Sequence, residues 1–319
     1  MTDQPIISDV RPATAGDYVQ LLKPRIMLLV VFTAFVGLVA AESVSGIAMH
    51  PFMAGMATLA VALGSGAAGA INMWYDSDID GQMTRTATRP IPSGAVPREE
   101  ALSLGLILSA ASVMLMWLAS NWLAAALLAL SIIYYGVIYT MWLKRATPQN
   151  IVIGGGAGAF PPVIGWAAVT GTVPQDAWIL FAIIFMWTPP HFWALSLVAH
   201  KQYEKVSVPM LPVTHGAGVT RRQIMVYTLV LFATTMLPLV TELGGVIYGV
   251  AAVLLGLVFI GLSARLLTTR AGEADASPAD NKFAMGTFAF SIFYLFAIYA
   301  ALLVEHLFGL TMPVSELLA

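Results

Sequence analysis

Cysteine is absent from this chain of 319 residues, and charged residues are scarce, at 10% of the total. Without cysteine there can be no disulfide, no thiolate metal site and no haem attached through a CxxCH motif, so any metal must be held by oxygen or nitrogen. The first ten residues, MTDQPIISDV, lack the basic segment and short apolar core of a secretory signal, and also the Arg-rich bias of a transit peptide. We therefore expect the first apolar run to be retained as a helix.

Hydrophobic residues are abundant, at 59% of the chain, and apolar runs recur from end to end. A helix needs about 20 mostly apolar residues to cross the hydrocarbon core of a membrane, and these runs are that long. The sequence therefore predicts an all-α, polytopic membrane bundle of about nine transmembrane helices. The expected spans are residues 26–44, 52–75, 101–119, 122–142, 150–170, 177–199, 223–242, 245–267 and 283–308.

Two loops occupy equivalent places four helices apart, after the second and the sixth span. Each holds a polar cluster, YDSDID or HKQYEK, and then a proline-containing turn, RPIPSG or VPMLPV. This pattern favours two four-helix halves plus a ninth helix. We expect a single transmembrane domain at residues 26–308, a cytoplasmic segment at 1–25 before it, and a short outer tail at 309–319.

The basic residues are distributed unevenly. When the connections are numbered alternately, all 15 Lys and Arg residues fall on one side of the membrane. The other side has none of them and carries Glu42, Asp176, Glu242, Glu305 and Glu316. Because cytoplasmic loops are enriched in Lys and Arg, we expect the N-terminus inside and the C-terminus outside, in a bacterial inner membrane. The long loops are cytoplasmic in this orientation, so the activity is expected at that face.

The end of the second span is unusually polar and reads NMWYDSDIDGQMTRTATRP from Asn72. If the helix continues, Asn72, Asp76 and Asp80 fall at i, i+4 and i+8 on one face, about 6 Å of rise apart, whereas Asp78 points elsewhere. Oxygen ligands on one stripe suit Mg²⁺, which completes its shell with water and substrate phosphates. A single interfacial carboxylate is usually only solvated, but Asn72 lies inside the apolar span, where an amide needs a partner.

Basic residues follow on the same side of the membrane. Arg85 and Arg89 come soon after the second span, and Lys144 and Arg145 follow the fourth. The arginine fork matches phosphate oxygens and lysine supplies a point charge. Carboxylates and cations together indicate an organic diphosphate bridged by a divalent metal, with each close charge pair worth about 4 kcal/mol at an effective dielectric near 20. Other basic residues are expected to face anionic lipid, namely Arg98, Arg221 and Arg222.

These residues also resemble a known family. NMWYDSDID with RTATRPIPSG resembles the first Asp-rich motif of the membrane-embedded aromatic prenyltransferases. Three further segments, YTMWLKRATPQNIVIGGGAGAFPPVIGWAAVTG, WTPPHFWALSL and VPMLPVTHG, resemble one branch of that superfamily, the protohaem IX farnesyltransferases. The resemblance implies transfer of a farnesyl group from farnesyl diphosphate to a vinyl group of haem b, with addition of water, to give haem O for terminal oxidases.

The resemblance implies roles for individual residues. It makes Asn72, Asp76 and Asp80 the ligands of Mg²⁺ and diphosphate, and with Lys144 they form the expected catalytic set. The expected substrate contacts are Arg85, Arg89, Tyr139, Arg145, His191 and Tyr203. One departure leaves a second metal position open, because the family usually has Asp before the tyrosine of the second loop and this chain has Gln202.

Further features carry weaker expectations. Tyr139 precedes Lys144 by five residues, and its aromatic face can stabilise a carbocation. His191 follows two prolines in the sixth span, and the sequence leaves it open as a haem ligand, a proton donor or a packing residue. The small residues of IGGGAGAFPP predict close helix packing. Residues 268–282 are expected to form a solvated loop.

Two other functions fit parts of the sequence. A sister prenyltransferase acting on a quinone precursor or another aromatic acceptor would share the first motif, and only TPPHFWALSL and VPMLPV favour haem. A membrane transporter would also use buried polar groups and broken helices, but the ionisable residues gather at one face. The expected partners are farnesyl diphosphate, haem b, membrane lipid, and the next enzyme of haem A synthesis or a terminal oxidase assembly factor, with no nucleic acid.

Overall fold

The computed structural model describes residues 12–312; residues 1–11 and 313–319, and with them Arg11 and Glu316, lie outside the described range. Between residues 12 and 312 nine helices are long and apolar enough to cross a membrane, which confirms the predicted count. They are α2 (Pro24–Ser45), α3 (Pro51–Asp80), α4 (Arg98–Ala119), α5 (Trp122–Ile133) continued by the π-helix η1 (Tyr134–Leu143) and α6 (Lys144–Ala146), α7 (Asn150–Thr170), α8 (Gln175–Lys205), α10 (Gly216–Thr235) continued by α11 (Leu237–Val240), α12 (Val246–Thr268) and α13 (Pro278–Phe308). Two further short helices are α1 (Ala15–Leu21) and α9 (Leu211–Thr214).

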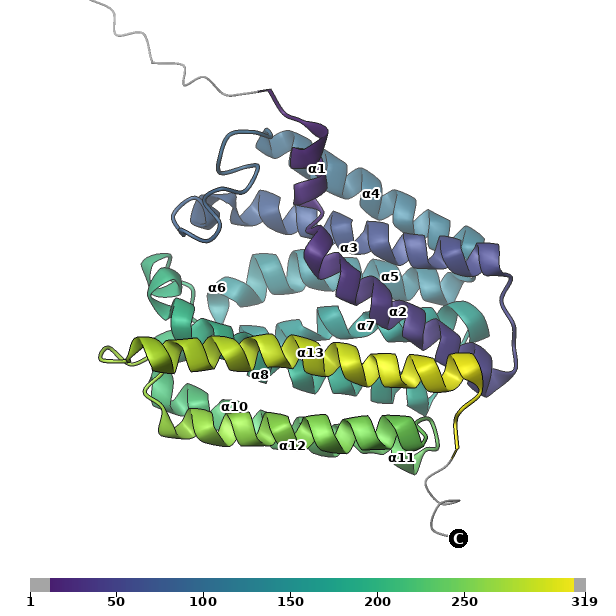
Figure 1. Cartoon of the computed structure of the whole chain (residues 1–319). Coiled ribbons are helices and arrows are strands. Elements are labelled where there is room, and N and C mark those ends of the chain that lie inside the picture. The colour runs from purple at the N-terminus through teal and green to yellow at the C-terminus, as the bar shows by residue number, and fades with distance from the viewer. Residues whose placement is uncertain (1–11, 313–319) are drawn as a thin grey trace, which may run out of the picture.

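The long helices lie side by side in a bundle (Figure 1). Consecutive helices pack on one another within each half. In the first half α2 packs on α3, α3 on α4 and α4 on α5, and in the second half α7 packs on α8, α8 on α10 and α10 on α12. Helix α7 joins the halves because it also packs on α2 and α5, while α13 contacts α2, α8 and α12. The predicted arrangement of two four-helix halves and a ninth helix is therefore present. Helix α7 is the most enclosed of the nine spans, with 83% of its most apolar stretch buried inside the protein.

Glycine allows two helices to touch through their backbones. A Cβ added to Gly37 of α2 would lie 2.2 Å from the carbonyl oxygen of Pro162, and one added to Gly165 of α7 would lie 2.0 Å from that of Ala34. In a membrane, where lipid is as apolar as a side chain, such close contact supplies the packing that holds helices together. The close packing predicted from the small residues of α7 is confirmed.

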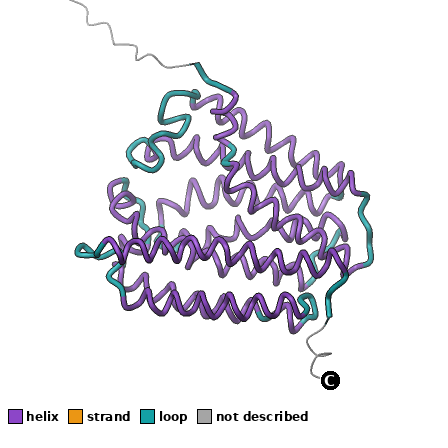
Figure 2. The backbone as a smooth tube through the Cα atoms, in the orientation of Figure 1, coloured by secondary structure: helices purple, strands orange, loops and turns teal. Residues whose placement is uncertain are grey.

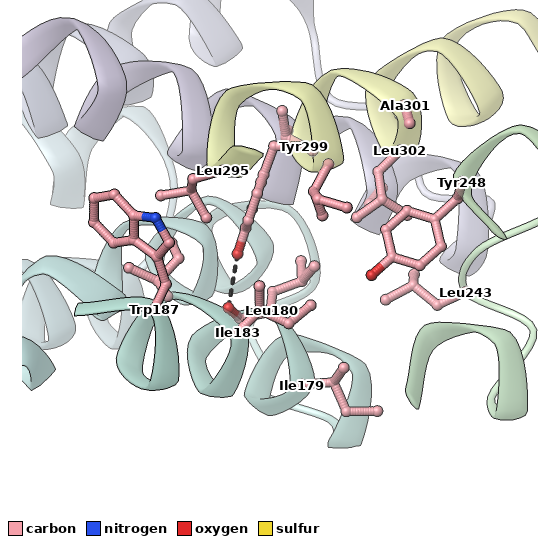
Figure 3. Close-up of a cluster of buried hydrophobic side chains, with 14 of the residues drawn as sticks. Ile179, Leu180, Ile183, Trp187, Leu243, Tyr248, Leu295, Tyr299, Ala301 and Leu302 are labelled. Atoms are coloured by element: carbon pink, nitrogen blue, oxygen red, sulfur yellow. Dashed lines mark hydrogen bonds between the residues drawn. The ribbon is translucent and has the colours of Figure 1, made fainter. Parts of the chain in front are cut away.

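A buried apolar cluster fills the space between α8, α12 and α13 (Figure 3). Leu180, Ile183 and Trp187 of α8 meet Tyr248 of α12 and Tyr299 of α13 there. Both tyrosine hydroxyls have a hydrogen-bond partner, as buried polar groups must, and that of Tyr248 donates to the carbonyl of Thr235 on α10 at 2.8 Å. In Figure 3 the Tyr299 hydroxyl donates to the carbonyl of Leu180, at 2.7 Å.

The opposite ends of the bundle differ. The long connections after α3, α8 and α12 lie at one end, on the left of Figures 1 and 2, and the short α2–α3 connection lies at the other. Helices α3 and α8 run to Asp80 and Lys205, beyond the apolar spans expected to end at residues 75 and 199. The end of α8 contacts the loop after α3, since Lys205 Nζ donates to the carbonyl of Gln82 at 3.2 Å.

The expectation that Arg221 faces lipid headgroups is wrong. Its side chain is buried, donates to the carbonyl of Ala271 at 2.7 Å and forms an ion pair with Glu273 at 2.9 Å. An unpaired buried charge is costly, so this arginine binds a neighbouring loop instead of lipid. The stretch at 268–282 is likewise more than a solvated loop, because Ala271 is fully buried and α13 begins at Pro278.

Candidate active site

The polar stripe of α3 is buried. The helix runs without a break from Pro51 to Asp80. Asn72, Asp76 and Asp80 are only 4%, 0% and 2% exposed, and Asn72 Nδ2 donates to Asp76 Oδ2 at 2.8 Å. The spacing of four residues therefore places all three side chains on one inward face, as predicted.

The wall facing this stripe is the π-helix η1. Backbone hydrogen bonds in a π-helix join residues five apart, and such segments occur frequently at functional sites. The N–H of Lys144 reaches the carbonyl of Tyr139 in this way. Residues four and five apart then share a face, which carries Tyr135, Tyr139, Thr140 and Lys144. Thr140 Oγ1 accepts from Asn72 Nδ2 at 2.9 Å, so this face contacts α3 directly.

A cation contacts each residue of the stripe. Lys144 Nζ lies 2.5 Å from Asp76 Oδ2, and Arg89 Nη1 lies 2.5 Å from Asp80 Oδ2. Lys23 Nζ donates to Asn72 Oδ1. The structure therefore brings together five of the predicted site residues, Asn72, Asp76, Asp80, Lys144 and Arg89, and adds Lys23.

Sequence reasoning missed Lys23, which lies just before the first membrane-spanning helix. It precedes Pro24 and has a left-handed backbone, with φ 53° and ψ 58°. Desolvation, together with the nearby charges of Arg89 and Lys144, lowers the pKa of the Lys23 amine to about 7. The available signal was its position at the start of the first span, on the side of the membrane predicted to hold the polar stripe and the basic residues. Its contacts with a helix 49 residues away were not readable from the sequence.

The expected substrate contacts fall into different surroundings. Arg85 Nη2 reaches the hydroxyl of Tyr203 at 3.5 Å, which ties the α3 loop to the end of α8. Tyr139 stacks on Tyr135 with ring centroids 5.5 Å apart, at the edge of the site.

Arg145 is held mainly by Asp78, the carboxylate expected to point away from the stripe. The guanidinium donates to both Asp78 oxygens, at 2.8 and 2.7 Å, and lies over the ring of Tyr75. Its nearest Asp76 oxygen is 3.7 Å away. Arg145 therefore reaches only the edge of the site.

His191 lies away from the charged cluster. Its Nδ1 is 2.7 Å from Ser291 Oγ, and its ring stacks between those of Trp187 and Phe288, with centroids 4.1 and 4.6 Å away. This environment is that of a hydrogen-bonded packing residue. The contact of His191 with substrate stays a prediction.

The residues of the stripe fit a divalent metal. Asp76 Oδ1 is buried and has no hydrogen-bond partner, so one carboxylate oxygen is available for a ligand. Within residues 12–312 no group of three or more His, Asp or Glu side chains could enclose a metal by itself. Two carboxylates and an amide instead suit Mg²⁺, which is usually bound by one or two carboxylates and completed by water and substrate phosphates.

Comparison with known proteins gives relatives over nearly the whole chain. The model of the UbiA prenyltransferase family matches residues 30–287. A protein of Hyphomonas neptunium named protoheme IX farnesyltransferase is 72% identical over 304 residues, which cover 95% of this chain and 96% of that protein. A protein of the same name from Caulobacter vibrioides is 52% identical over 320 residues, covering 96% and 95% of the two chains.

Solved structures share the fold at low sequence identity. The apo structure of a UbiA homologue from Aeropyrum pernix is similar with a TM-score of 0.69 at 19% identity, covering 86% of this chain and 97% of that one. A UbiA homologue from Archaeoglobus fulgidus, bound to GPP and Mg²⁺, gives a TM-score of 0.60 at 17% identity, covering 90% and 99%. Identities this low establish the common fold alone.

Proposed function

The chain belongs to the UbiA prenyltransferase family, and on that basis we propose that it transfers a farnesyl group from farnesyl diphosphate to a vinyl group of haem b. Water adds in the same reaction, and the products are haem O and diphosphate. The observation that carries the proposal is a buried polar cluster at the end of an apolar bundle. In it the side chains of Asn72, Asp76 and Asp80 contact those of Lys23, Lys144 and Arg89. The relatives named protoheme IX farnesyltransferase support the choice of acceptor.

The charged residues of the site suit the diphosphate end of the substrate. Lys144 and Arg89 already lie at the carboxylates, and their remaining donors can bind diphosphate oxygens as charge-assisted hydrogen bonds. Arg85 adds a guanidinium at the mouth, held by Tyr203. When bound by Asn72, Asp76 and Asp80, Mg²⁺ would neutralise charge that develops on the leaving group.

The reaction separates charge inside an apolar bundle. The allylic C–O bond breaks, and its electron pair leaves with the diphosphate. The vinyl π electrons of haem then form the new C–C bond, and the resulting cation takes up the oxygen of water with release of a proton. Lys144 and Arg89 are fixed before the reaction begins, which is the condition for electrostatic stabilisation without reorganisation. The stacked faces of Tyr135 and Tyr139 can stabilise the farnesyl cation and exclude water.

We place the site at the cytoplasmic face of a bacterial inner membrane. The chain is a multi-pass membrane protein, and the segments that form the site lie on the side that collects all basic residues. In this membrane a lipid-soluble product can pass to the next enzyme of haem A synthesis or to an assembly factor of a terminal oxidase.

The test is turnover by purified protein supplied with farnesyl diphosphate, haem b and Mg²⁺, followed by mass analysis of the pigment. We expect haem O from the wild type and a loss of about 100-fold or more for Asp76→Ala and for Asp80→Ala, because groups that stabilise developing charge contribute on that scale. Asp78→Ala is the matched control, since the Asp78 side chain is 53% exposed and contacts Arg145 outside the stripe. Unchanged turnover in Asp76→Ala, with the variant folded, would remove the metal assignment.

A further inference from the structure

Lys23 contacts the stripe at an oxygen assigned to the metal. Its amine donates to Asn72 Oδ1, and it also lies 3.5 Å from the hydroxyl of Tyr135. The amide nitrogen of Asn72 is already used, since it donates to Asp76 and Thr140. The carboxamide orientation is therefore determined on both sides, and its oxygen points at the lysine.

The Lys23 amine reaches the site from a residue whose backbone has an unfavourable, left-handed conformation. A non-glycine residue in the left-handed region costs on the order of 1–3 kcal/mol and persists only where its surroundings fix it. The surroundings here are α3, which this segment passes closely at Gly69. A Cβ on Gly69 would lie 3.3 Å from the carbonyl oxygen of Leu21 and 3.5 Å from Lys23 Cδ.

A metal and this lysine compete for the same oxygen. Mg²⁺ binds through oxygen ligands, and Lys23 Nζ already donates to Asn72 Oδ1. A metal ion on the same oxygen would lie beside the lysine ammonium, and close like charges repel. A divalent cation entering alone would also meet three cationic side chains, Lys23, Arg89 and Lys144, against two carboxylates. A diphosphate brings the negative charge that offsets both the metal and these side chains.

We propose that Lys23 is an internal counter-cation of Asn72 Oδ1 that moves to the diphosphate oxygens when metal and diphosphate bind together. The proposal rests on the proposed function, because it takes the stripe as the metal site. The flexible four-carbon stem of lysine, with three donors on its amine, permits the exchange. Metal and diphosphate then raise each other's affinity by the same factor, as linkage requires.

Lys23→Met separates this role from simple substrate binding, because methionine keeps the apolar stem and removes the amine. Calorimetry on the full chain in detergent measures the affinity for Mg²⁺ alone and then, at saturating Mg²⁺, the affinity for farnesyl thiodiphosphate. We expect Lys23→Met to bind Mg²⁺ alone about three- to tenfold more tightly, and the thiodiphosphate about tenfold more weakly, since one charge-assisted hydrogen bond is involved in each case. The opposite signs distinguish displacement from a structural role.

Two variants control for folding and for charge. Lys23→Arg keeps a cation and is expected to retain most thiodiphosphate affinity, whereas Arg25→Ala removes an exposed cation two residues away and should change neither affinity. Weaker binding of Mg²⁺ alone by Lys23→Met, or unchanged binding of both ligands, would overturn the proposal. The proposed function fails separately, if the wild type binds no thiodiphosphate or makes no haem O.

Discussion

Lys144 and Arg145 are neighbours in the sequence, but they make different contacts. Lys144 lies at a fully buried carboxylate oxygen of Asp76, with its own side chain 16% exposed. The Arg145 side chain is 33% exposed, and both of its terminal guanidinium nitrogens donate to the half-exposed carboxylate of Asp78. Exposed ion pairs contribute little because water and salt screen them, while a charge fixed in a buried site is screened much less.

We therefore expect Lys144→Met to weaken diphosphate binding about tenfold or more, and Arg145→Met to weaken it by clearly less. Calorimetric titration of both variants with farnesyl thiodiphosphate at saturating Mg²⁺ gives the comparison. Raising the salt concentration should reduce the effect of Arg145→Met and leave most of that of Lys144→Met. Equal losses in the two variants would contradict the assignment of Lys144 as the inner cation.

At the scale of single residues, the sequence predicts which side chains share one face of a helix, because that follows from helical periodicity. The stripe of Asn72, Asp76 and Asp80 follows from a spacing of four, and its face is buried as expected. Lys23 and Thr140 were missed because their roles depend on how α2 and η1 pack on α3, and pairing between distant helices leaves no local pattern.

The element that shapes the site is η1, and α7 packs directly on it. A Cβ added to Gly154 of α7 would lie 2.2 Å from the ring of Tyr139, so glycine at this position lets the ring pack directly against the helix. Gly158, one turn later on the same helix, has nothing within 4 Å of an added Cβ. The two positions therefore provide a matched pair.

We expect Gly154→Ala to lower stability by about 1–3 kcal/mol through overpacking, or to displace Tyr139 and lower haem O formation. Gly158→Ala should be neutral or stabilising by up to about 1 kcal/mol, because alanine is the better helix former. Thermal unfolding in detergent and the haem O assay at low temperature measure the two effects. A Gly154→Ala protein that matches Gly158→Ala in both would show that the contact with Tyr139 has no consequence.

Apolar runs predicted the membrane-spanning helices well and their ends less well. Helix α3 continues to Asp80 and α8 to Lys205, because polar residues at the rim can be helical as long as their backbone is hydrogen-bonded. The π-helix register of η1 was not predicted. The run of residues 122–142 is as apolar as a regular span, so hydrophobicity does not distinguish the two forms.

The whole molecule has chemically different ends. The loop after α3, helix α6 and the ends of α3 and α8 lie at one end, which is the basic side of the chain, while the α2–α3 connection lies at the other (Figure 1). Because Lys and Arg bias loops toward the cytoplasm, we expect the candidate active site to face the cytoplasm. The orientation can be tested without disturbing the site, because the chain has no cysteine and any introduced thiol is unique.

Ala48 and Ala274 are suitable positions for such a test. Both are exposed alanines in connecting loops, Ala48 between α2 and α3 and Ala274 between α12 and α13, so a cysteine at either one replaces a small side chain without loss of a packed contact. A maleimide that cannot cross membranes should label the Ala48→Cys variant in intact cells that have a permeable outer membrane. It should label the Ala274→Cys variant only after the inner membrane is opened, whereas the reverse pattern would place the diphosphate site on the outer face, away from a cytoplasmic supply of substrate.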